Sequence, residues 1–248
     1  MTLLRIEYTK TGLLRYLGHL DMVRLFERGF RRGQVPLLFS QGFNPHPKIA
    51  FAAPLSVGYS SEAELVEIEV EAGWEDQQLS RIFSECFPSE IAYRRHRILG
   101  SSKSLMSMMR SSDYQLVWSL PKAFCEDAVK VVEGFEALSS LTAVKKSKGK
   151  KDKEVALKPM VHTLKLIKTG EPVTRKVVTP AEVLEIEQCD LTIVATLNAG
   201  SESNLKPDLL MDALAKLAGM EGGTPGTALQ VHRTALYGEG GKALFDME

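Results

Sequence analysis

Four arginines with helical spacing form the first group of residues that could bind a ligand. Arg24, Arg28 and Arg32 are four residues apart, and Arg31 lies beside the last of them. Residues four apart share one face of a helix, so this spacing aligns their guanidinium groups in a stripe. A guanidinium group binds phosphate through two parallel hydrogen bonds. We therefore predict an oxyanion-binding surface, the arginine face; the alternative is a helix face that contacts only solvent.

A stiff loop, residues 40–48 with the sequence SQGFNPHPK, follows this segment. Each of its two prolines fixes its own φ and keeps the preceding residue, Asn44 or His46, out of the helical region. A stiff loop loses little entropy on binding, so its side chains suit contacts with a base or a phosphate, although a purely structural turn would need the same prolines. The predicted contact residues of this loop, the Phe43 loop, are Phe43, Asn44, His46 and Lys48.

Charge is segregated along the chain although 31 basic and 31 acidic residues cancel overall. Residues 1–50 carry an excess of positive charge, residues 51–92 an excess of negative charge, and residues 93–110 only positive charge. Such segregation creates local fields, although separate solvated faces would give the same pattern. The last segment adds three residues to the predicted phosphate-binding set: Arg94, Arg95 and Arg97.

Catalytic groups are few. His19 and His46 are the weak candidates for acid–base catalysis, and no second histidine or carboxylate stands at metal-ligand spacing beside His46. The glycine-rich stretch 219–226 lacks the lysine and the spacing of a phosphate-binding loop. We therefore predict no metal, no cofactor and a role in binding rather than catalysis, while a histidine-dependent activity such as RNA cleavage stays open.

Cysteine usage and hydropathy favour the cytoplasm. Cys86, Cys125 and Cys189 are odd in number and widely spaced, which indicates neither a disulfide framework nor a four-cysteine zinc site. The first residues lack the apolar core of a signal peptide, and no stretch reaches the roughly 20 apolar residues of a membrane span. The expectation is a cytoplasmic protein without membrane contact.

Hydrophobic periodicity predicts the elements that position these residues. Leu4, Ile6 and Tyr8 alternate with polar residues, as in a half-buried strand, and the apolar side of residues 18–32 predicts an amphipathic helix. A strand with an acidic outer face is predicted at residues 65–70. Strand, helix, strand, strand, helix, strand is the order of the split βαβ, or ferredoxin-like, fold.

The same order recurs after a serine-rich segment. We predict an α+β protein of two tandem ferredoxin-like domains with antiparallel sheets, at residues 1–100 and 113–248, joined by a linker at 101–112. In the second domain, residues 183–186 and 191–197 are expected to form a hairpin that turns at residues 188–190. The lysines between 145 and 153 indicate a solvated hairpin tip or a nucleic-acid contact.

Residues 18–59 resemble a bacterial family called the radical SAM-linked proteins. The resemblance rests on His19-Leu20-Asp21, on the arginine-rich helix, and on Gly-Phe-Asn-Pro-His-Pro-Lys at 42–48. Gly18 stands where the family pattern has serine. The resemblance implies a radical SAM enzyme as a partner in trans, acting on RNA or the translation machinery, because this sequence lacks the C-x-x-x-C-x-x-C cysteines of such enzymes.

Together these features predict a non-catalytic RNA-binding accessory protein that acts with a radical SAM enzyme in tRNA or rRNA modification or in ribosome-related maturation. The alternatives are an enzyme in its own right, or a protein-interaction module that docks its partner through the acidic segment 62–76. The sequence leaves the oligomeric state open.

Overall fold

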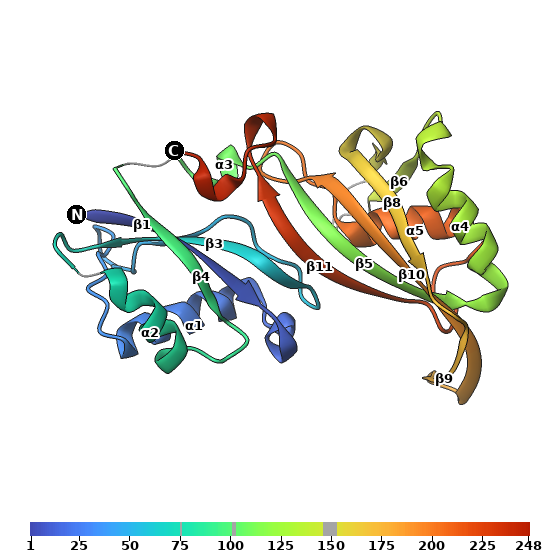
Figure 1. The fold of residues 1–248 in the computed structure, drawn as a ribbon, viewed down its shortest axis with the longest axis horizontal. Helices are drawn as coiled ribbons and strands as arrows, with labels where there is room; N and C mark the ends of the chain where they lie inside the picture. Colours follow the sequence, from blue (N-terminus) through green and yellow to red (C-terminus); the bar gives the residue numbers. More distant parts are fainter. Residues whose placement is uncertain (75, 101–102, 146–152) are drawn as a thin grey trace. The chain divides into compact units, whose positions relative to one another are not determined.

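The computed structural model describes residues 1–74, 76–100, 103–145 and 153–248 (Figure 1). The chain divides into two compact units. Unit 1 comprises residues 1–111, 200–202 and 232–248, and unit 2 comprises residues 112–199 and 203–231. The last residues of the chain therefore belong to the same unit as the first.

Unit 1 is built on an antiparallel sheet. Its strands are β1 (Thr2–Lys10), β2 (Ile49–Phe51), β3 (Ser60–Val70) and β4 (Tyr93–Leu99). The strand order is β4-β1-β3, and β2 pairs with β3. Strand β11 (Ala228–Tyr237) begins in unit 2 and ends in unit 1, where His232 and Arg233 pair in parallel with Ser60 and Ser61.

Two helices, α1 (His19–Arg32) and α2 (Leu79–Cys86), cover one face of this sheet (Figure 1). The alternating apolar residues of β1 pack with the apolar side of α1 in one core. The helix begins after Gly18 and ends before Gly33, as predicted. Gly29 lets α1 pack closely against Phe87, because a Cβ at this position would lie 2.4 Å from the Phe87 ring. The apolar residues that alternate along β1 and those that follow helical spacing along α1 thus form one buried core.

The opposite face of the sheet carries a buried ion pair. Arg5 is fully buried, and its Nε and Nη2 donate to Glu67 Oε1 at 2.9 and 2.7 Å. Its Nη1 donates to the carbonyl oxygens of Leu244 and Phe245 at 3.0 and 3.1 Å, and to that of Met247. A buried charge needs this degree of hydrogen bonding to be tolerated. Arg5 therefore holds the C-terminal residues against the sheet.

A second buried ion pair joins the middle of β11 to β3. Arg233 donates from Nε to Glu64 Oε1 at 2.9 Å, and from Nη2 to both carboxylate oxygens at 2.6 and 2.7 Å. Both side chains are buried. Glu64 and Glu67 both lie on β3, where the alternation of the sequence predicted an acidic outer face. That prediction is wrong at these two residues, because each is buried and neutralised by an arginine distant in sequence.

A short helix, α3 (Leu105–Met108), lies in the segment predicted as a linker. Leu105, Met108 and Met109 are buried in unit 1. Residues 101–102 lie outside the described part of the chain, and the predicted domain boundaries stay a prediction.

Unit 2 has the strands β5 (Ser111–Pro121), β6 (Thr142–Lys145), β7 (Lys153–Ala156), β8 (Val161–Thr169), β9 (Val173–Val178) and β10 (Val183–Asn198). Its sheet runs in the order β11-β5-β10-β8, with β9 paired to β10, and β6 pairs with β7 in a separate sheet. The helices are α4 (Cys125–Glu133) and α5 (Pro207–Leu217). Among the lysines of the predicted hairpin tip, those between 146 and 152 lie outside the described residues.

Strand β10 corrects one prediction. The expected hairpin turning at residues 188–190 is absent, and β10 continues through these residues to pair with β9 and then with β8. Cys189 and Leu191 are buried, and the Gln188 side chain donates to the Gly226 carbonyl oxygen. These interactions keep the polar residues inside a strand rather than in a turn.

A disulfide joins Cys125, the first residue of α4, to Cys189 on β10, with an S–S distance of 2.11 Å. The cysteine spacing indicated no disulfide framework, and it gave no sign of this single bond. The two cysteines are 64 residues apart in sequence, and only the packing of α4 on the sheet brings them together. Cys86 is a free thiol.

The fold as a whole mixes α-helices and β-strands, with mostly antiparallel strands and few helices, as the predicted α+β class requires. The finer assignment to two ferredoxin-like domains stays a prediction. No helix in the described part of the chain is both long and apolar enough to span a membrane.

Candidate nucleic-acid interface

The arginine face is exposed to solvent. Helix α1 turns Met22, Phe26 and Phe30 into the core and leaves all four arginines on the outside. Arg24 lies 3.5 Å from Asp21, and both side chains are more than half exposed. The other three form no ion pair with any residue that the structure describes: Arg28, Arg31 and Arg32. Their charges are thus available to an external anion.

The Phe43 loop closes through its own hydrogen bonds. The Ser40 amide donates to the His46 carbonyl oxygen at 2.9 Å, and the Lys48 amide donates to the Leu38 carbonyl oxygen at 2.8 Å. The Ser40 hydroxyl also lies 2.9 Å from His46 Nδ1 and accepts a bond from the His46 amide at 3.1 Å. Phe43 is fully exposed at the tip, with a relative accessibility of 111%. The stiffness expected from the prolines is thus supported by hydrogen bonds across the loop.

Several predicted basic residues already have acidic partners. Lys48 Nζ lies 2.6 Å from Glu69, and Arg97 lies 3.0 Å from Glu248. Arg95 Nε lies 2.7 Å from Glu7, and its guanidinium carbon lies 4.0 Å from the centre of the Phe245 ring. Arg94 is exposed and forms no ion pair among the described residues. These pairs neutralise much of the charge that the sequence assigned to phosphate binding.

The predicted set also divides between two faces of unit 1. On β1, the residues that alternate with the core residues are Arg5 and Glu7, which lie opposite Arg97 and Arg95 of β4. Directly opposed residues share a sheet face, so Arg95 and Arg97 lie on the face away from α1. The structure therefore does not bring them together with the arginine face.

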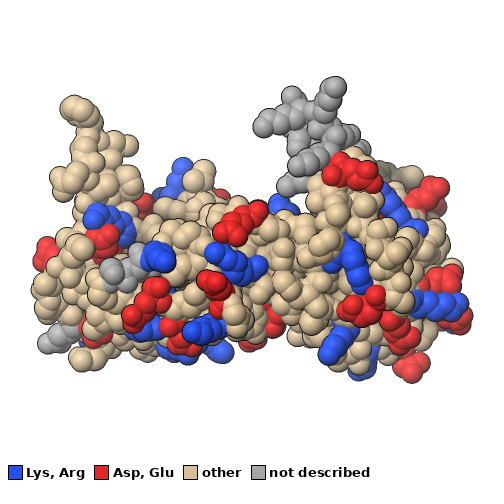
Figure 2. Space-filling model, turned by 90° about the horizontal axis from the view of Figure 1, so that it is seen from above, with Lys and Arg blue, Asp and Glu red and all other residues tan. Residues whose placement is uncertain are grey.

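Charges are interspersed on the surface seen in Figure 2, where basic and acidic side chains alternate without a large patch of one sign. In the acidic segment proposed for docking, Glu67 is buried against Arg5 and Glu69 is bonded to Lys48. These two carboxylates are therefore engaged within unit 1.

Neither candidate histidine is bonded to a carboxylate among the residues that the structure describes. His19 is exposed and lies edge-on to the Phe51 ring, with centroids 5.6 Å apart. His46 is bonded to Ser40 within its loop. No cluster of three or more metal-ligating side chains occurs in the part of the chain that the structure describes.

A third histidine, which the sequence reasoning missed, does have a carboxylate partner. His96 on β4 lies 2.9 Å from Asp76 through Nε2 and 2.7 Å from the Tyr93 hydroxyl through Nδ1. Burial, and then the Asp76 charge, raise the pKa of Tyr93, while a hydrogen bond with the His96 backbone opposes the rise. A carboxylate that orients an imidazole beside a hydroxyl is the arrangement of a catalytic triad. Asp76 precedes His96 by 20 residues, a spacing that carries no local signal.

A small cavity of about 20 Å³, lined by both apolar and charged side chains, lies at the end of β1, beside His19. Its lining includes Tyr8, Lys10 and Glu64. Burial lowers the pKa of Lys10, an effect that Glu64 opposes and Arg233 reinforces, and its Nζ donates to the Leu17 carbonyl oxygen at 2.8 Å. The volume suits about one water molecule. We read this cluster as a packed polar core next to the Arg233–Glu64 pair.

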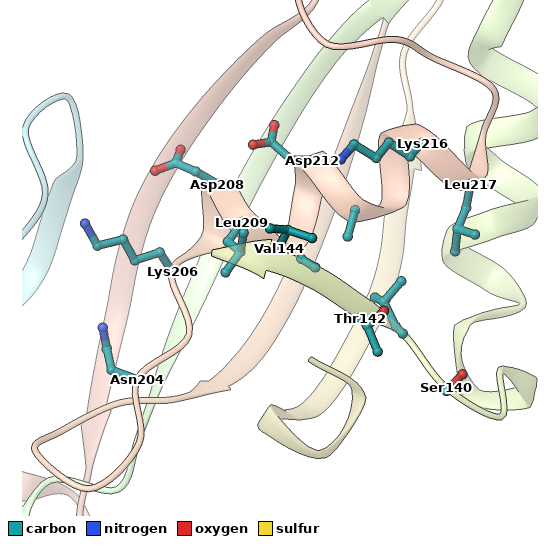
Figure 3. A pocket seen from close by; sticks show the side chains of 13 residues that line it. Ser140, Thr142, Val144, Asn204, Lys206, Asp208, Leu209, Asp212, Lys216 and Leu217 are labelled. Carbon is teal, nitrogen blue, oxygen red and sulfur yellow. The ribbon is translucent and has the colours of Figure 1, made fainter. Parts of the chain in front are cut away.

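Unit 2 contains a larger cavity of about 710 Å³ between α5 and β6. Figure 3 shows Val144 of β6 beside Leu209 of α5, with charged side chains spread along the helix. Burial, reinforced by Asp208 and opposed by Lys216, raises the pKa of Asp212. The lining carries lysines and aspartates as well as apolar side chains, so it selects no single class of ligand by charge.

Fold and surface together define a mixed α and β protein whose first unit presents an arginine-bearing helix and a stiff aromatic loop. The chain belongs to the family described as "Uncharacterized protein conserved in bacteria (DUF2344)", whose model matches residues 3–207. No curated protein matches the sequence. The comparisons make no link to radical SAM proteins, so that resemblance stays a prediction.

Among solved structures, the chain is similar to one from a Cbf5-Nop10-Gar1 complex, with a TM-score of 0.48 and 10% sequence identity. The match covers 94% of this chain and 48% of that one, so the chain spans about half the length of its structural relative. A similarity of this size supports no inference about function.

Proposed function

We propose that this protein binds RNA through unit 1 and acts as an accessory to an enzyme that modifies the RNA. One observation carries the proposal: the arginine face exposes four guanidinium groups on one helix, and three of them have no ion-pair partner among the described residues. Like charges four residues apart destabilise a helix by a few tenths of a kcal/mol per pair. A phosphate backbone removes that repulsion and releases counterions, which makes binding favourable.

A radical SAM enzyme is the partner we propose, acting on tRNA, rRNA or a maturing ribosome. The support is the resemblance of residues 18–59 to the radical SAM-linked proteins, which includes both the arginine face and the Phe43 loop. In this proposal the arginine face holds the RNA, and the partner supplies the chemistry.

We also propose two ferredoxin-like domains as the scaffold. In unit 1 the elements follow the order β1, α1, β2, β3, α2, β4, and the sheet order is β4-β1-β3-β2. In unit 2, β5, α4, β8, β10, α5 and β11 follow the same scheme with the sheet order β11-β5-β10-β8. Both orders support a split βαβ arrangement.

Salt-dependent binding to total tRNA and to rRNA fragments tests the RNA proposal. We expect the logarithm of the association constant to fall linearly with the logarithm of salt concentration. The double substitution Arg28→Gln/Arg32→Gln should reduce the slope by about 2, because each lost phosphate contact removes about one unit. The matched control is Lys165→Gln/Lys168→Gln on β8 of unit 2, where both lysines are exposed. Absence of binding at low salt would refute the proposal.

Co-purification from the native bacterium tests the partner. Tagged protein should retain a radical SAM enzyme after nuclease treatment if the two proteins contact each other directly. Loss of the enzyme on nuclease treatment would mean that RNA alone bridges them. Failure to recover any radical SAM enzyme under either condition would refute this part of the proposal.

A second candidate function, an enzyme in its own right, is favoured by the Asp76–His96–Tyr93 chain of hydrogen bonds. His96→Gln and Tyr93→Phe should each abolish RNA cleavage or another RNA-dependent turnover if this chain is catalytic. The matched control is His162→Gln, since His162 also makes a side-chain hydrogen bond but lies in unit 2. Unchanged turnover in both variants would exclude this chain, and His19→Ala/His46→Ala tests the remaining histidines in the same assay.

A further inference from the structure

We infer that the Phe43 loop is a stacking platform for an unpaired nucleotide, so that the RNA bound by unit 1 presents a base outside a helix. The inference rests on the proposed RNA binding and narrows it to a class of RNA. It starts from the exposure of Phe43, whose side chain lies fully in solvent at the tip of its loop. Stacking of this ring on a base would remove its apolar surface from water, which is favourable.

The loop that carries this ring is closed by its own hydrogen bonds before any ligand arrives. Two backbone hydrogen bonds close the loop at its base, and the Ser40 hydroxyl contacts both His46 Nδ1 and the His46 amide. Gly42, next to the ring, has a φ of 130°, a value that a residue with a side chain adopts only with strain. The ring therefore projects from a preformed turn, and stacking costs little conformational entropy.

The neighbouring side chains add hydrogen bonds of the kind that a base edge needs. Asn44 is exposed, and its amide both donates and accepts, so it can pair with an adenine edge or with another base. His46 is exposed and uses Nδ1 within the loop, and the structure records no hydrogen bond of Nε2 with a described residue. A stacking ring beside an amide and an imidazole is how proteins read single-stranded RNA.

An unpaired nucleotide fits this tip better than a duplex does. Bases inside a helix are stacked on both sides and offer no free aromatic face, whereas a base in a loop or bulge offers one. Residues 41–47 also carry no lysine or arginine, so the tip makes no strong contact with backbone phosphates by itself. The arginine face supplies phosphate binding, and the Phe43 loop supplies selection for an exposed base.

Two RNA probes of equal phosphate number test the inference: a hairpin with 2-aminopurine in its single-stranded loop, and a fully paired duplex. We expect tighter binding of the hairpin, with quenching of 2-aminopurine fluorescence as the base stacks on Phe43. Phe43→Leu keeps an apolar side chain but removes the aromatic face, so it should weaken hairpin binding about 5- to 100-fold. Phe43→Trp should retain both the affinity and the quenching.

The matched control is Phe39→Leu, which changes a half-exposed aromatic residue at the base of the same loop. It should leave the preference for the hairpin unchanged. The salt dependence of hairpin binding should be equal in the wild type and in Phe43→Leu, because Phe43 contacts no phosphate.

The outcomes separate this inference from the proposal on which it rests. If hairpin and duplex bind equally and Phe43→Leu changes neither, while Arg28→Gln/Arg32→Gln weakens both, the inference fails and RNA binding stands. If neither RNA binds at low salt, the proposed function itself fails, and the inference fails with it. If Phe43→Leu abolishes retention of a protein partner but leaves hairpin binding intact, the loop anchors a protein and the inference is overturned.

Discussion

Unit 1 contains arginines in two contrasting environments. Arg5 and Arg233 are buried, and each binds a glutamate and at least one backbone carbonyl oxygen. Arg28 and Arg32 are exposed on α1 and have no ion-pair partner among the described residues. The two buried arginines thus connect distant parts of the chain, whereas the two arginines on α1 leave their charges exposed to solvent.

The contrast separates structure from binding. A buried guanidinium group has lost its hydration, so it must be satisfied within the protein, and removing its partner leaves an uncompensated charge. An exposed one keeps its hydration and gains little from a surface partner, so its loss hardly affects folding. Substitution of the first kind should change stability, and substitution of the second kind should change RNA affinity.

Breaking a buried pair should have the largest effect. Glu67→Gln leaves Arg5 buried without a counter-charge, and we expect unit 1 to lose about 3–5 kcal/mol of unfolding free energy. Thermal unfolding should show a shift of about 6–20 °C, because 1 kcal/mol corresponds to about 2–4 °C in a chain of this size. Glu71→Gln, an exposed carboxylate of the same segment, is the control. A loss below about 1 kcal/mol would contradict a structural role for the pair.

The disulfide of unit 2 offers a covalent counterpart to these ion pairs. Cys125→Ser or treatment with reductant should destabilise unit 2 by about 2–4 kcal/mol, since the bond closes a loop of 64 residues. Denaturant unfolding with and without reductant measures the loss, and thiol titration of the unfolded protein should find one free thiol before reduction and three after it. Cys86→Ser is the control. Equal stability with and without reductant would contradict this prediction.

An ion pair of intermediate exposure tests the contrast through pH. In unit 2, Arg175 donates to Asp190 at 2.8 Å, and the Ser119 hydroxyl donates to the same carboxylate at 2.6 Å. The Arg175 hydrogen bond, together with that of Ser119, lowers the pKa of Asp190 to about 2 despite the opposing effect of partial burial. The stabilisation is therefore complete above the unfolded-state pKa of about 4 and is lost as pH falls from there to about 2.

Asp190→Asn should accordingly be less stable than the wild type at pH 7, and the difference should vanish near pH 2. Urea unfolding at several pH values measures this difference. A difference that stayed constant down to pH 2 would show that the carboxylate charge contributes nothing.

The sequence predicted local features well and long-range partners poorly. Helix α1 could be predicted because its apolar period, Gly18 and Gly33 are all contained in 16 residues. Glu67 looked like a solvated residue because its partner Arg5 is 62 residues away. Residues so distant in sequence follow no spacing rule. Arg5 and Glu67 can be recognised as partners only when the pairing of β1 with β3 is known.

The same limit applies to the candidate site. The exposure of the arginine face follows from helical periodicity alone, whereas the neutralisation of Arg95 by Glu7 depends on the pairing of β4 with β1. His96 was missed for the same reason, because its partner Asp76 lies 20 residues earlier in the sequence and outside β4. The periodicity of a single helix or strand therefore predicts which side chains are exposed. Which of the exposed charges form ion pairs depends on the strand pairing of the whole fold.

The smallest expected effect on stability comes from the arginine face itself. Arg28→Gln/Arg32→Gln removes like charges spaced four apart, so we expect the unfolding free energy to rise by a few tenths of a kcal/mol at low salt. The gain should disappear at about 1 M salt, where the screening length falls to about 3 Å. Arg24→Gln, which also removes the contact with Asp21, should show a smaller gain. Calorimetry at two salt concentrations measures both variants, and a destabilisation above 1 kcal/mol would mean that these arginines, like Arg5, hold the fold together.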